Sequence, residues 1–366
     1  MSFRHLAGMS GRAALATVIL AAGLTAGLAR AHDGGGLEAG AVYTQSNAAA
    51  GNAVLAFRRA ADGSLAAAGS YRTGGNGLGR GLGSQGAVAL SQNGRWLFAV
   101  NAGSNSISSF RVDHRGLALA DVVDSGGVRP VSLTVHGNVL YVLNQGSDGI
   151  AGFWIGNRGE LEPIPHSARP LSAPNANGAE IAFSPDGDVL VVTLRALSVI
   201  DTFPVEDDVA RPALPSPAAG QGPFGFDFDR RGRIFVTEAA STTVSSYQVS
   251  EDDGARAISA AVPAGGNAPC WLVVTRNGRY AFETNAASGT VSRFAIAHDG
   301  SITFLGTAPA LGAGVTDEAL SGGSRYLYAL MGGSGAIDAF AVGQDGSLTP
   351  IAGAVLPAGA AGLAAR

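Results

Sequence analysis

Short runs of alternating apolar and small polar residues recur along the chain, and each run ends in an aromatic residue. Alternation with a period of two is typical of β-strands that bury one face. The runs are about 45 residues apart, a spacing typical of repeat proteins. They are NAVLAF ending at Phe57, NSISSF at Phe110, DGIAGF at Phe153, LSVIDTF at Phe203, TTVSSY at Tyr247, GTVSRF at Phe294 and GAIDAF at Phe340.

Each repeat has the same internal order of strands and turns. In one copy the first strand, WLVVT, leads through the turn RNGR to the second strand, YAFETN. A loop of small residues comes next, followed by the third strand, TVSRFAI, the turn HDGS and the fourth strand, ITFLG. The Asn-Gly and Asp-Gly turns suit two-residue hairpin loops, because glycine adopts positive φ without steric cost. Four short antiparallel strands at this period predict a blade of a β-propeller.

The two ends of the repeat array are complementary. The first copy, from Ala41 to about Gly74, has no counterpart of the first strand, and the last copy is followed by an extra segment, Gly359 to Ala365, that resembles one. We therefore predict an all-β, seven-bladed β-propeller with four antiparallel strands per blade, whose C-terminal strand completes the N-terminal blade. A β-sandwich or an open solenoid is the alternative, but neither explains complementary half-blades. Closure of the ring also removes exposed sheet edges.

Residues 1–31 have the pattern of a secretory leader. Basic residues, including Arg4 and Arg12, precede an apolar run from Ala13 to Leu28, and the small residues Ala29 and Ala31 follow. We expect cleavage near His32, a single domain over 32–366, a periplasmic or secreted location and no membrane span in the mature form.

Removal of the leader takes three arginines from a chain of net charge −4 and leaves −7. An acidic chain argues against a nucleic-acid partner. The single cysteine, Cys270, excludes an internal disulfide, so stability must come from the core. We expect a monomer without a cofactor or a required metal site.

The loops between blades and between second and third strands are variable, whereas the other turns are uniform. We therefore expect function on the variable face, near the mouth of the central channel. The segment RTGGNGLGRGLGSQ is expected to be a long mobile loop over this face. At the end of the second strand, Glu238 replaces the asparagine found at Asn101, Asn144 and Asn285. It is a candidate catalytic carboxylate, although a glutamate can also cap the turn.

Near the start of the innermost strand, Glu180 and Asp317 occupy a column otherwise held mostly by small residues. Carboxylates are seldom buried without partners, and Arg129 and Arg195 fall on the same predicted face. One interpretation is an ion-pair network between blades. The other is a channel mouth with catalytic carboxylates and guanidinium groups that binds a polar or anionic small molecule. Trp271 is either a stacking platform for a ligand or a packing residue.

The repeats resemble the seven-bladed lactonase propellers that include bacterial 6-phosphogluconolactonase and fungal carboxymuconate cyclase. The units that carry the resemblance include PCWLVVTRNGRYAFETNAASGTVSRFAIAHDGSIT. The family's chemistry is associated with a Gly-x-Gly-Pro-Arg-His segment followed by Asn-Glu at the end of the next strand. Here Gly220, Gly222, Pro223 and Glu238 match, but the segment GQGPFGFDF has Phe224 and a glycine where Arg and His would be.

The resemblance implies a hydrolase or cyclase acting on a small lactone or sugar-acid-type substrate at the channel mouth. Water activation needs a base, and the developing oxyanion needs positive charge. Glu238, Glu180 or Asp317 is the candidate base, with Arg129 or Arg195 as the stabiliser and Phe224 and Trp271 as further ligand contacts. The alternative is a non-catalytic exported propeller that binds a ligand or a protein partner, which the missing Arg-His pair favours.

Overall fold

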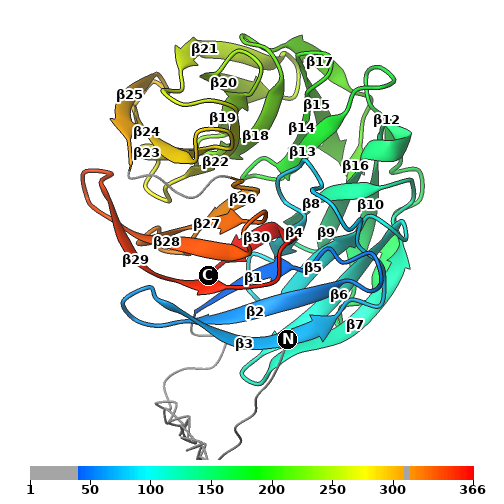
Figure 1. Cartoon of the computed structure of the whole chain (residues 1–366). Helices are drawn as coiled ribbons and strands as arrows, with labels where there is room; N and C mark the ends of the chain where they lie inside the picture. The colour runs from blue at the N-terminus through cyan, green and yellow to red at the C-terminus, as the bar shows by residue number, and fades with distance from the viewer. Residues whose placement is uncertain (1–39, 309–313) are drawn as a thin grey trace, which may run out of the picture. The chain divides into compact units, whose positions relative to one another are not determined.

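Seven antiparallel sheets form the described part of the protein, and they are the blades of a propeller (Figure 1). The structure is a computed structural model that describes residues 40–308 and 314–366; the predicted leader lies outside these residues. The innermost strands of successive blades contact one another in a closed cycle. The all-β, seven-bladed prediction is therefore confirmed.

The C-terminal strand completes the first blade, as the complementary ends predict. In this blade β30 (Ala361–Ala365) is innermost and pairs antiparallel with β1 (Ala41–Gln45). The blade continues outward with β2 (Ala53–Arg59) and β3 (Leu65–Arg72). Figure 1 shows β30 between β26 and β4, and it contacts both.

Four other blades each consist of four strands in chain order, with the first strand innermost. Blade two contains β4 (Val88–Leu90), β5 (Trp96–Asn101), β6 (Ser106–Asp113) and β7 (Gly116–Asp124). Blade five contains β18 (Pro223–Phe228), β19 (Arg233–Glu238), β20 (Thr243–Ser250) and β21 (Gly254–Pro263). Blade six contains β22 (Pro269–Val274), β23 (Tyr280–Asn285), β24 (Thr290–Ile296) and β25 (Ile302–Thr307). Blade seven contains β26 (Asp317–Leu320), β27 (Tyr326–Met331), β28 (Ala336–Val342) and β29 (Leu348–Val355).

Blades three and four depart from this plan because two short pieces replace the outermost strand. Prolines interrupt both outer segments, and proline cannot donate a ladder hydrogen bond. Blade three contains β8 (Pro130–His136), β9 (Val139–Asn144), the 3-10 turn η1 (Gln145–Ser147), β10 (Gly149–Ile155), β11 (Leu161–Pro163) and β12 (Arg169–Pro170). Blade four contains β13 (Gly178–Phe183), β14 (Val189–Leu194), β15 (Val199–Glu206), β16 (Val209–Ala210) and β17 (Leu214–Pro217).

The aromatic residue that ends each run is a core residue of the interface between blades. All seven aromatic side chains are buried. Burial of a side chain of this size stabilises the fold by about 2–3 kcal/mol relative to its exposure. The repeat therefore exists because each blade must bury its faces against its neighbours.

The turns between first and second strands are longer than the two-residue loops that the Asn-Gly pattern predicts. In blade six the turn runs from Thr275 to Tyr280, and the Tyr280 N–H donates to Thr275 Oγ1 at 3.0 Å. Gly278 has φ of +66° and its N–H donates to the Thr275 carbonyl at 2.7 Å. The threonine hydroxyl closes the wider loop, which the dipeptide alone does not reveal. We call the end of the propeller that carries these turns the turn face.

The innermost strands are sheet edges, so their N–H groups need partners. Carboxylates of the preceding blade supply some of them. Glu180 Oε2 accepts the Phe226 N–H at 2.7 Å, and Asp227 Oδ2 accepts the Val274 N–H at 2.8 Å. These acidic residues therefore join neighbouring blades through main-chain groups.

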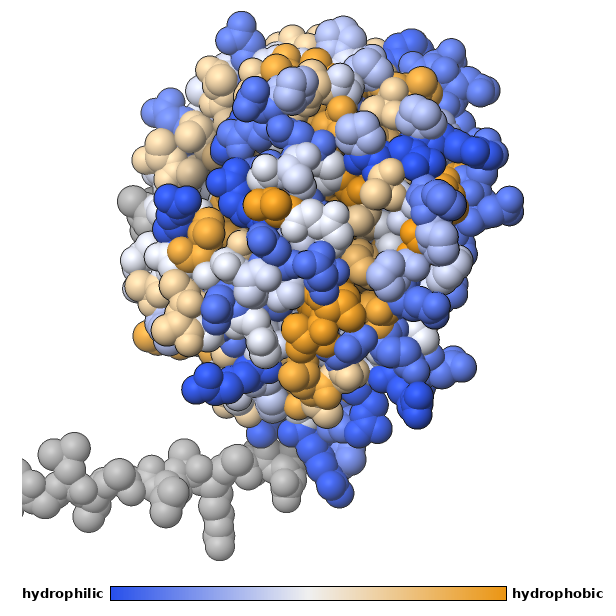
Figure 2. Space-filling view, turned by 90° about the vertical axis from the view of Figure 1, so that its right-hand side faces the viewer, coloured by the Kyte–Doolittle hydropathy of each residue, from blue (hydrophilic) through white to orange (hydrophobic). Residues whose placement is uncertain are grey.

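On the face shown in Figure 2, small areas of apolar side chains lie among hydrophilic ones. On β7, Leu119 and Val122 are exposed, and exposed apolar residues of this kind are normal on a protein surface. No helix within residues 40–308 and 314–366 is long and apolar enough to cross a membrane.

Candidate functional site

The central channel is blocked between its two ends by a plug, which we define as Leu82–Gln85 with Phe224 and Trp271. Gln85 reaches across the ring: its Nε2 donates to the Leu272 carbonyl at 2.9 Å, and its Oε1 accepts the Leu272 N–H at 3.0 Å. Trp271 Nε1 donates to the carbonyl of Ser84 at 2.9 Å. The end of the segment expected to be a mobile loop, Leu82–Gln85, is instead fastened inside the channel.

Aromatic packing closes the rest of the plug. The rings of Phe224 and Trp271 are both buried and meet edge to face, with centroids 5.4 Å apart. Buried aromatic rings in this arrangement contribute packing energy and leave no open face for a ligand. Trp271 and Phe224 therefore lie in the plug, and neither lines a cavity at either end of the channel.

One cavity lies at the end of the channel that carries the loops between blades, and we call it the arginine mouth. Its volume is about 560 Å³. Three arginines line it, Arg80, Arg129 and Arg195, together with Gln145 and Asp148 among its polar residues. Among the described side chains, none of these three arginines forms an ion pair within 4.0 Å.

One guanidinium group of this mouth, that of Arg195, lies against an aromatic ring. The guanidinium carbon of Arg195 lies 5.1 Å from the centroid of the Phe224 ring. Burial lowers the pKa of Arg195; Cys270 raises it, and the nearby Arg129 lowers it. Arg129 Nε is buried without a hydrogen-bond partner. Two close cations that lack acidic partners make this cavity suitable for an anion.

A second cavity lies on the other side of the plug and opens toward the turn face; we call it the acidic cavity. Its volume is about 410 Å³. Its walls include four carboxylates, those of Glu180, Asp227, Asp317 and Glu318. Burial raises the pKa of Glu180, Asp317 and Glu318 well above the usual range and that of Asp227 to about 7.

The structure does not assemble the predicted group of residues. Arg129 and Arg195 line the arginine mouth, whereas Glu180 and Asp317 line the acidic cavity beyond the plug. No ion pair between these arginines and carboxylates occurs within 4.0 Å in the described part of the chain. The predicted ion-pair network and the predicted channel mouth with both carboxylates and guanidinium groups each require these side chains to lie close together. In the structure they lie in two different cavities.

Glu238 lines neither cavity and is fully buried at the end of β19. Its Oε1 accepts the Gly220 N–H at 2.7 Å and the Tyr247 hydroxyl at 3.0 Å, and its Oε2 accepts the Thr243 hydroxyl at 2.6 Å. These contacts tie the loop before β18 to the end of β19 and to β20. The geometry supports the capping interpretation of this glutamate.

We expect Glu238→Gln to lower the free energy of unfolding by about 1–3 kcal/mol, because the amide cannot accept at both ends. Urea unfolding of the variant beside wild type measures the loss, with Glu162→Gln on the exposed side of β11 as a matched control. Unchanged stability together with lost activity on a lactone would contradict a capping role and support a catalytic one.

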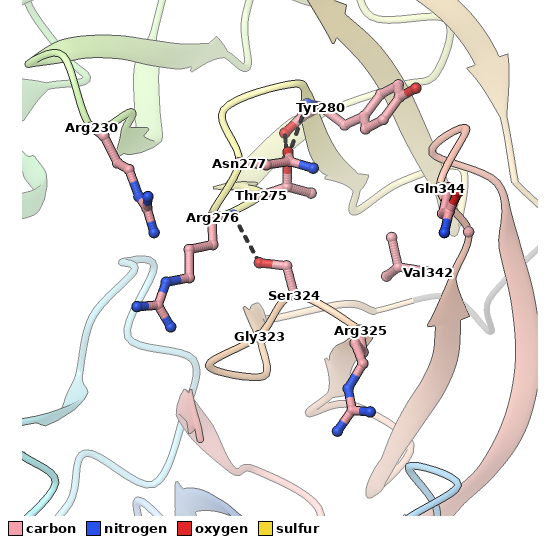
Figure 3. A pocket seen from close by; sticks show the side chains of 11 residues that line it. Arg230, Thr275, Arg276, Asn277, Tyr280, Gly323, Ser324, Arg325, Val342 and Gln344 are labelled. Atoms are coloured by element: carbon pink, nitrogen blue, oxygen red, sulfur yellow. Dashed lines mark hydrogen bonds between the residues drawn. The ribbon is translucent and has the colours of Figure 1, made fainter.

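A third cavity, of about 380 Å³, lies on the turn face (Figure 3). Arg230, Arg276 and Arg325 lie on the first-to-second-strand turns of three successive blades, and the Arg276 N–H donates to Ser324 Oγ at 2.8 Å. Arg276 and Ser324 also line the acidic cavity. Positive charge therefore borders the opening of that cavity.

Sequence reasoning missed Gln85, Arg80, Asp148 and Asp227 as channel residues. Asp227 lies two positions after the column of Glu180, so its side chain has the same direction along the innermost strand. The same alignment could have found it. Gln85 and Arg80 belong to a loop without a repeat counterpart, so the alignment carries no signal for them.

The fold and the site define the class of this protein: it is a β-propeller with a plugged central channel and a channel mouth lined by arginines. The family model described as Lactonase, 7-bladed beta-propeller, matches residues 50–172, 157–264 and 236–362. The chain belongs to this family of seven-bladed lactonase propellers. No curated protein sequence matches it significantly.

Solved structures share this fold at low sequence identity. A Bacteroides uniformis protein to which 6-phosphogluconolactonase activity is ascribed is 18% identical, with a TM-score of 0.73; the match covers 89% of this chain and 99% of that one. Periplasmic gluconolactonase PpgL from Pseudomonas aeruginosa is 19% identical, with a TM-score of 0.69 and coverage of 88% and 99%. A protein from Lactobacillus plantarum is 15% identical, with a TM-score of 0.74 and coverage of 89% and 99%. At these identities the likeness concerns the fold.

Proposed function

We propose that the arginine mouth binds a small sugar-acid-type molecule and opens its lactone ring. The observation that carries this proposal is the cavity of about 560 Å³ lined by Arg80, Arg129 and Arg195, none of which has an ion-pair partner among the described residues. Guanidinium groups match carboxylate and phosphate geometry. Membership of the lactonase family supports a lactone as the reactive form.

The residues of the mouth suggest how the ring would open. Among the described residues that line the cavity, Asp148 is the one with an acidic side chain. The main-chain N–H groups of Asn175 and Ala176 donate to its carboxylate at 2.7 and 3.1 Å, which fixes its orientation. It would take a proton from the attacking water as the water oxygen bonds to the lactone carbonyl carbon.

The remaining step breaks the acyl carbon–oxygen bond of the ring. Arg129 and Arg195 would stabilise the negative charge on the carbonyl oxygen, and the ring oxygen would leave as a hydroxyl with the proton held by Asp148. The acid formed at the acyl carbon would release the second proton of the water to solvent, and its carboxylate would then face the same guanidinium groups. Glu180, Asp317 and Glu238 do not line this cavity, so the geometry favours Asp148 over them as the base.

The test is hydrolysis of aldono-, butyro- and muconolactones followed with a pH indicator, beside a thermal-shift titration with the corresponding acids. We expect turnover above the spontaneous rate and a loss of about 100-fold in Arg195→Met and in Asp148→Asn. Arg111→Met, at an exposed side chain of β6, is the matched control and should retain activity. Absence of both turnover and acid binding would overturn the proposal.

Non-catalytic binding is the second candidate function. Phe224 and Gly225 stand where the family pattern has Arg and His, and Phe224 belongs to the plug. Acid binding that Arg195→Met abolishes, without turnover of any lactone, would support this candidate. We further infer export, on the basis of the leader-like residues 1–31.

A further inference from the structure

Gln145 is a long polar residue at a position where most blades have a small one. It directly follows β9, the second strand of blade three, and begins η1. The residues that directly follow the second strands of the other six blades are Ser46, Ala102, Arg195, Ala239, Ala286 and Gly332. Only Gln145 and Arg195 are large, and both line the arginine mouth. Because the other five blades fold with a small residue here, the fold itself does not require the length of Gln145.

The orientation of the Gln145 amide is fixed from the neighbouring blade. Its Nε2 donates to the carbonyl of Gly178 at 2.7 Å, and Gly178 begins β13, the innermost strand of blade four. A carbonyl only accepts, so the amide nitrogen must point toward Gly178 and the amide oxygen away from it. The main-chain N–H of Gln145 also donates to the Arg129 carbonyl at 3.0 Å. Gln145 is therefore held next to one of the arginines of the mouth.

The amide oxygen of Gln145 is left as an acceptor in the mouth. The residue is 6% exposed, yet its Oε1 accepts no hydrogen bond from the described residues and is not one of the fully enclosed polar atoms. Because Gln145 lines the arginine mouth, this oxygen is available to a molecule that binds there. An amide oxygen accepts a hydrogen bond from a hydroxyl group but cannot bond to a carboxylate, which has no donor.

The wall of the arginine mouth is polar over most of its extent. Among the described residues that line it, only Leu78 and Leu82 have large apolar side chains, and Asn175 and Asn177 add two side-chain amides to that of Gln145. A ligand that fills such a cavity displaces water from these groups and must replace the lost hydrogen bonds. A ligand with hydroxyl groups can do so, whereas a hydrocarbon chain cannot.

We propose that Gln145 makes the arginine mouth selective for hydroxylated ligands, because its Oε1 accepts a hydrogen bond from a hydroxyl group of the ligand. This inference rests on the proposed function, in which Arg129 and Arg195 hold the acid or lactone carbonyl end of the same molecule. Guanidinium groups only donate, so they recognise the acid group, and the Gln145 oxygen recognises the hydroxyl. A ligand without hydroxyl groups would leave this oxygen desolvated and unpaired, which lowers its affinity.

The experiment is isothermal titration at pH 7.5 with sodium gluconate and with sodium hexanoate, which has the same chain length and carboxylate but no hydroxyl groups. We expect wild type to bind gluconate about tenfold or more tightly than hexanoate. Gln145→Met should weaken gluconate about tenfold, the effect of one lost hydrogen bond, and leave the affinity for hexanoate unchanged or slightly higher. Gln92→Met, at an exposed residue of the turn face, is the matched control and should bind both acids as wild type.

A purely structural role of Gln145 predicts a different result. Loss of its contact with Gly178 would then weaken both acids equally, or lower the melting temperature alone, and the ratio of the two affinities would stay as in wild type. Such a result would overturn the proposal. If Gln145→Met does not fold, Gln145→Glu replaces it: a carboxylate in the mouth should weaken both acids by repulsion. Unchanged binding of both acids to Gln145→Glu would show that this side chain does not reach the ligand.

The outcomes separate this inference from the proposed function. Gluconate binding that Arg195→Met weakens and Gln145→Met leaves unchanged would overturn the role of Gln145 alone. Equal affinity of wild type for gluconate and hexanoate would also overturn the selectivity and leave an acid-binding mouth. Absence of binding of either acid to wild type would overturn the selectivity together with acid binding at the mouth.

Discussion

A chain that ends at Gly359 is expected to lose cooperative folding. The truncation removes β30, whose ladder with β1 includes the pairs Tyr43↔Ala364 and Thr44↔Leu363. About five hydrogen bonds at about 1 kcal/mol each, with burial of Leu363 at about 2 kcal/mol, approach the net stability of a domain, roughly 5–15 kcal/mol. The open ring would also expose β1 as a sheet edge, which favours aggregation.

Circular dichroism with thermal melting, and size-exclusion chromatography, measure this effect. We expect aggregation or a transition without cooperativity in the truncated chain, and partial recovery when a synthetic peptide of residues 360–366 is added. Val355→Ala, at a side chain that is 86% exposed on the outermost strand of blade seven, is the control and should melt as wild type. A truncated chain that melts within a few degrees of the full chain would show that closure contributes little.

The blades were predictable because each carries its own pattern. Alternation, turn residues and the final aromatic are local features, and every copy repeats them. Ring closure was predictable because an unpaired strand at one end matched a missing strand at the other. The split outer strands of blades three and four were not foreseen, although Pro163 and Pro215 lie within them.

The plug could not be predicted from the repeats. Gln85 contacts Leu272, 187 positions later in the chain, and the segment that carries Gln85 has no counterpart in other blades. Only the closed ring brings the two together. A glycine-rich stretch is compatible with a mobile loop and with a segment packed tightly in a channel, and local composition does not distinguish them.

The separation of charge along the channel was missed for a related reason. Column alignment places Glu180 and Arg195 near the same end of their blade, but the side chains are divided by the plug. The direction of a long side chain depends on its neighbours in three dimensions. The residue types of the site were therefore predictable, and their grouping was not.

Stability is expected to fall as the pH rises from about 5 to about 8.5. Burial raises the pKa of Asp227 to about 7 and that of Glu180, Asp317 and Glu318 well above the usual range. The folded protein thus holds protons that the unfolded chain has released above pH of about 4. Where the folded state binds more protons, the free energy of unfolding decreases with increasing pH.

The size of the effect follows from the pKa of Asp227. A shift from 3.8 to about 7 corresponds to at most about 4 kcal/mol. Because Asp227 lines an open cavity and keeps partial exposure, we expect about 1–3 kcal/mol from this residue. The loss should begin above the unfolded pKa of about 4 and be complete as the pH passes through about 7.

Urea unfolding at pH 5 and pH 8.5 measures the difference, and Asp227→Asn should reduce it because the amide does not titrate. Exposed Glu162→Gln should leave the difference unchanged. Equal stability at the two pH values in wild type would mean that water or ions in the cavity compensate the buried charges, so that the channel acids are ionised throughout this range.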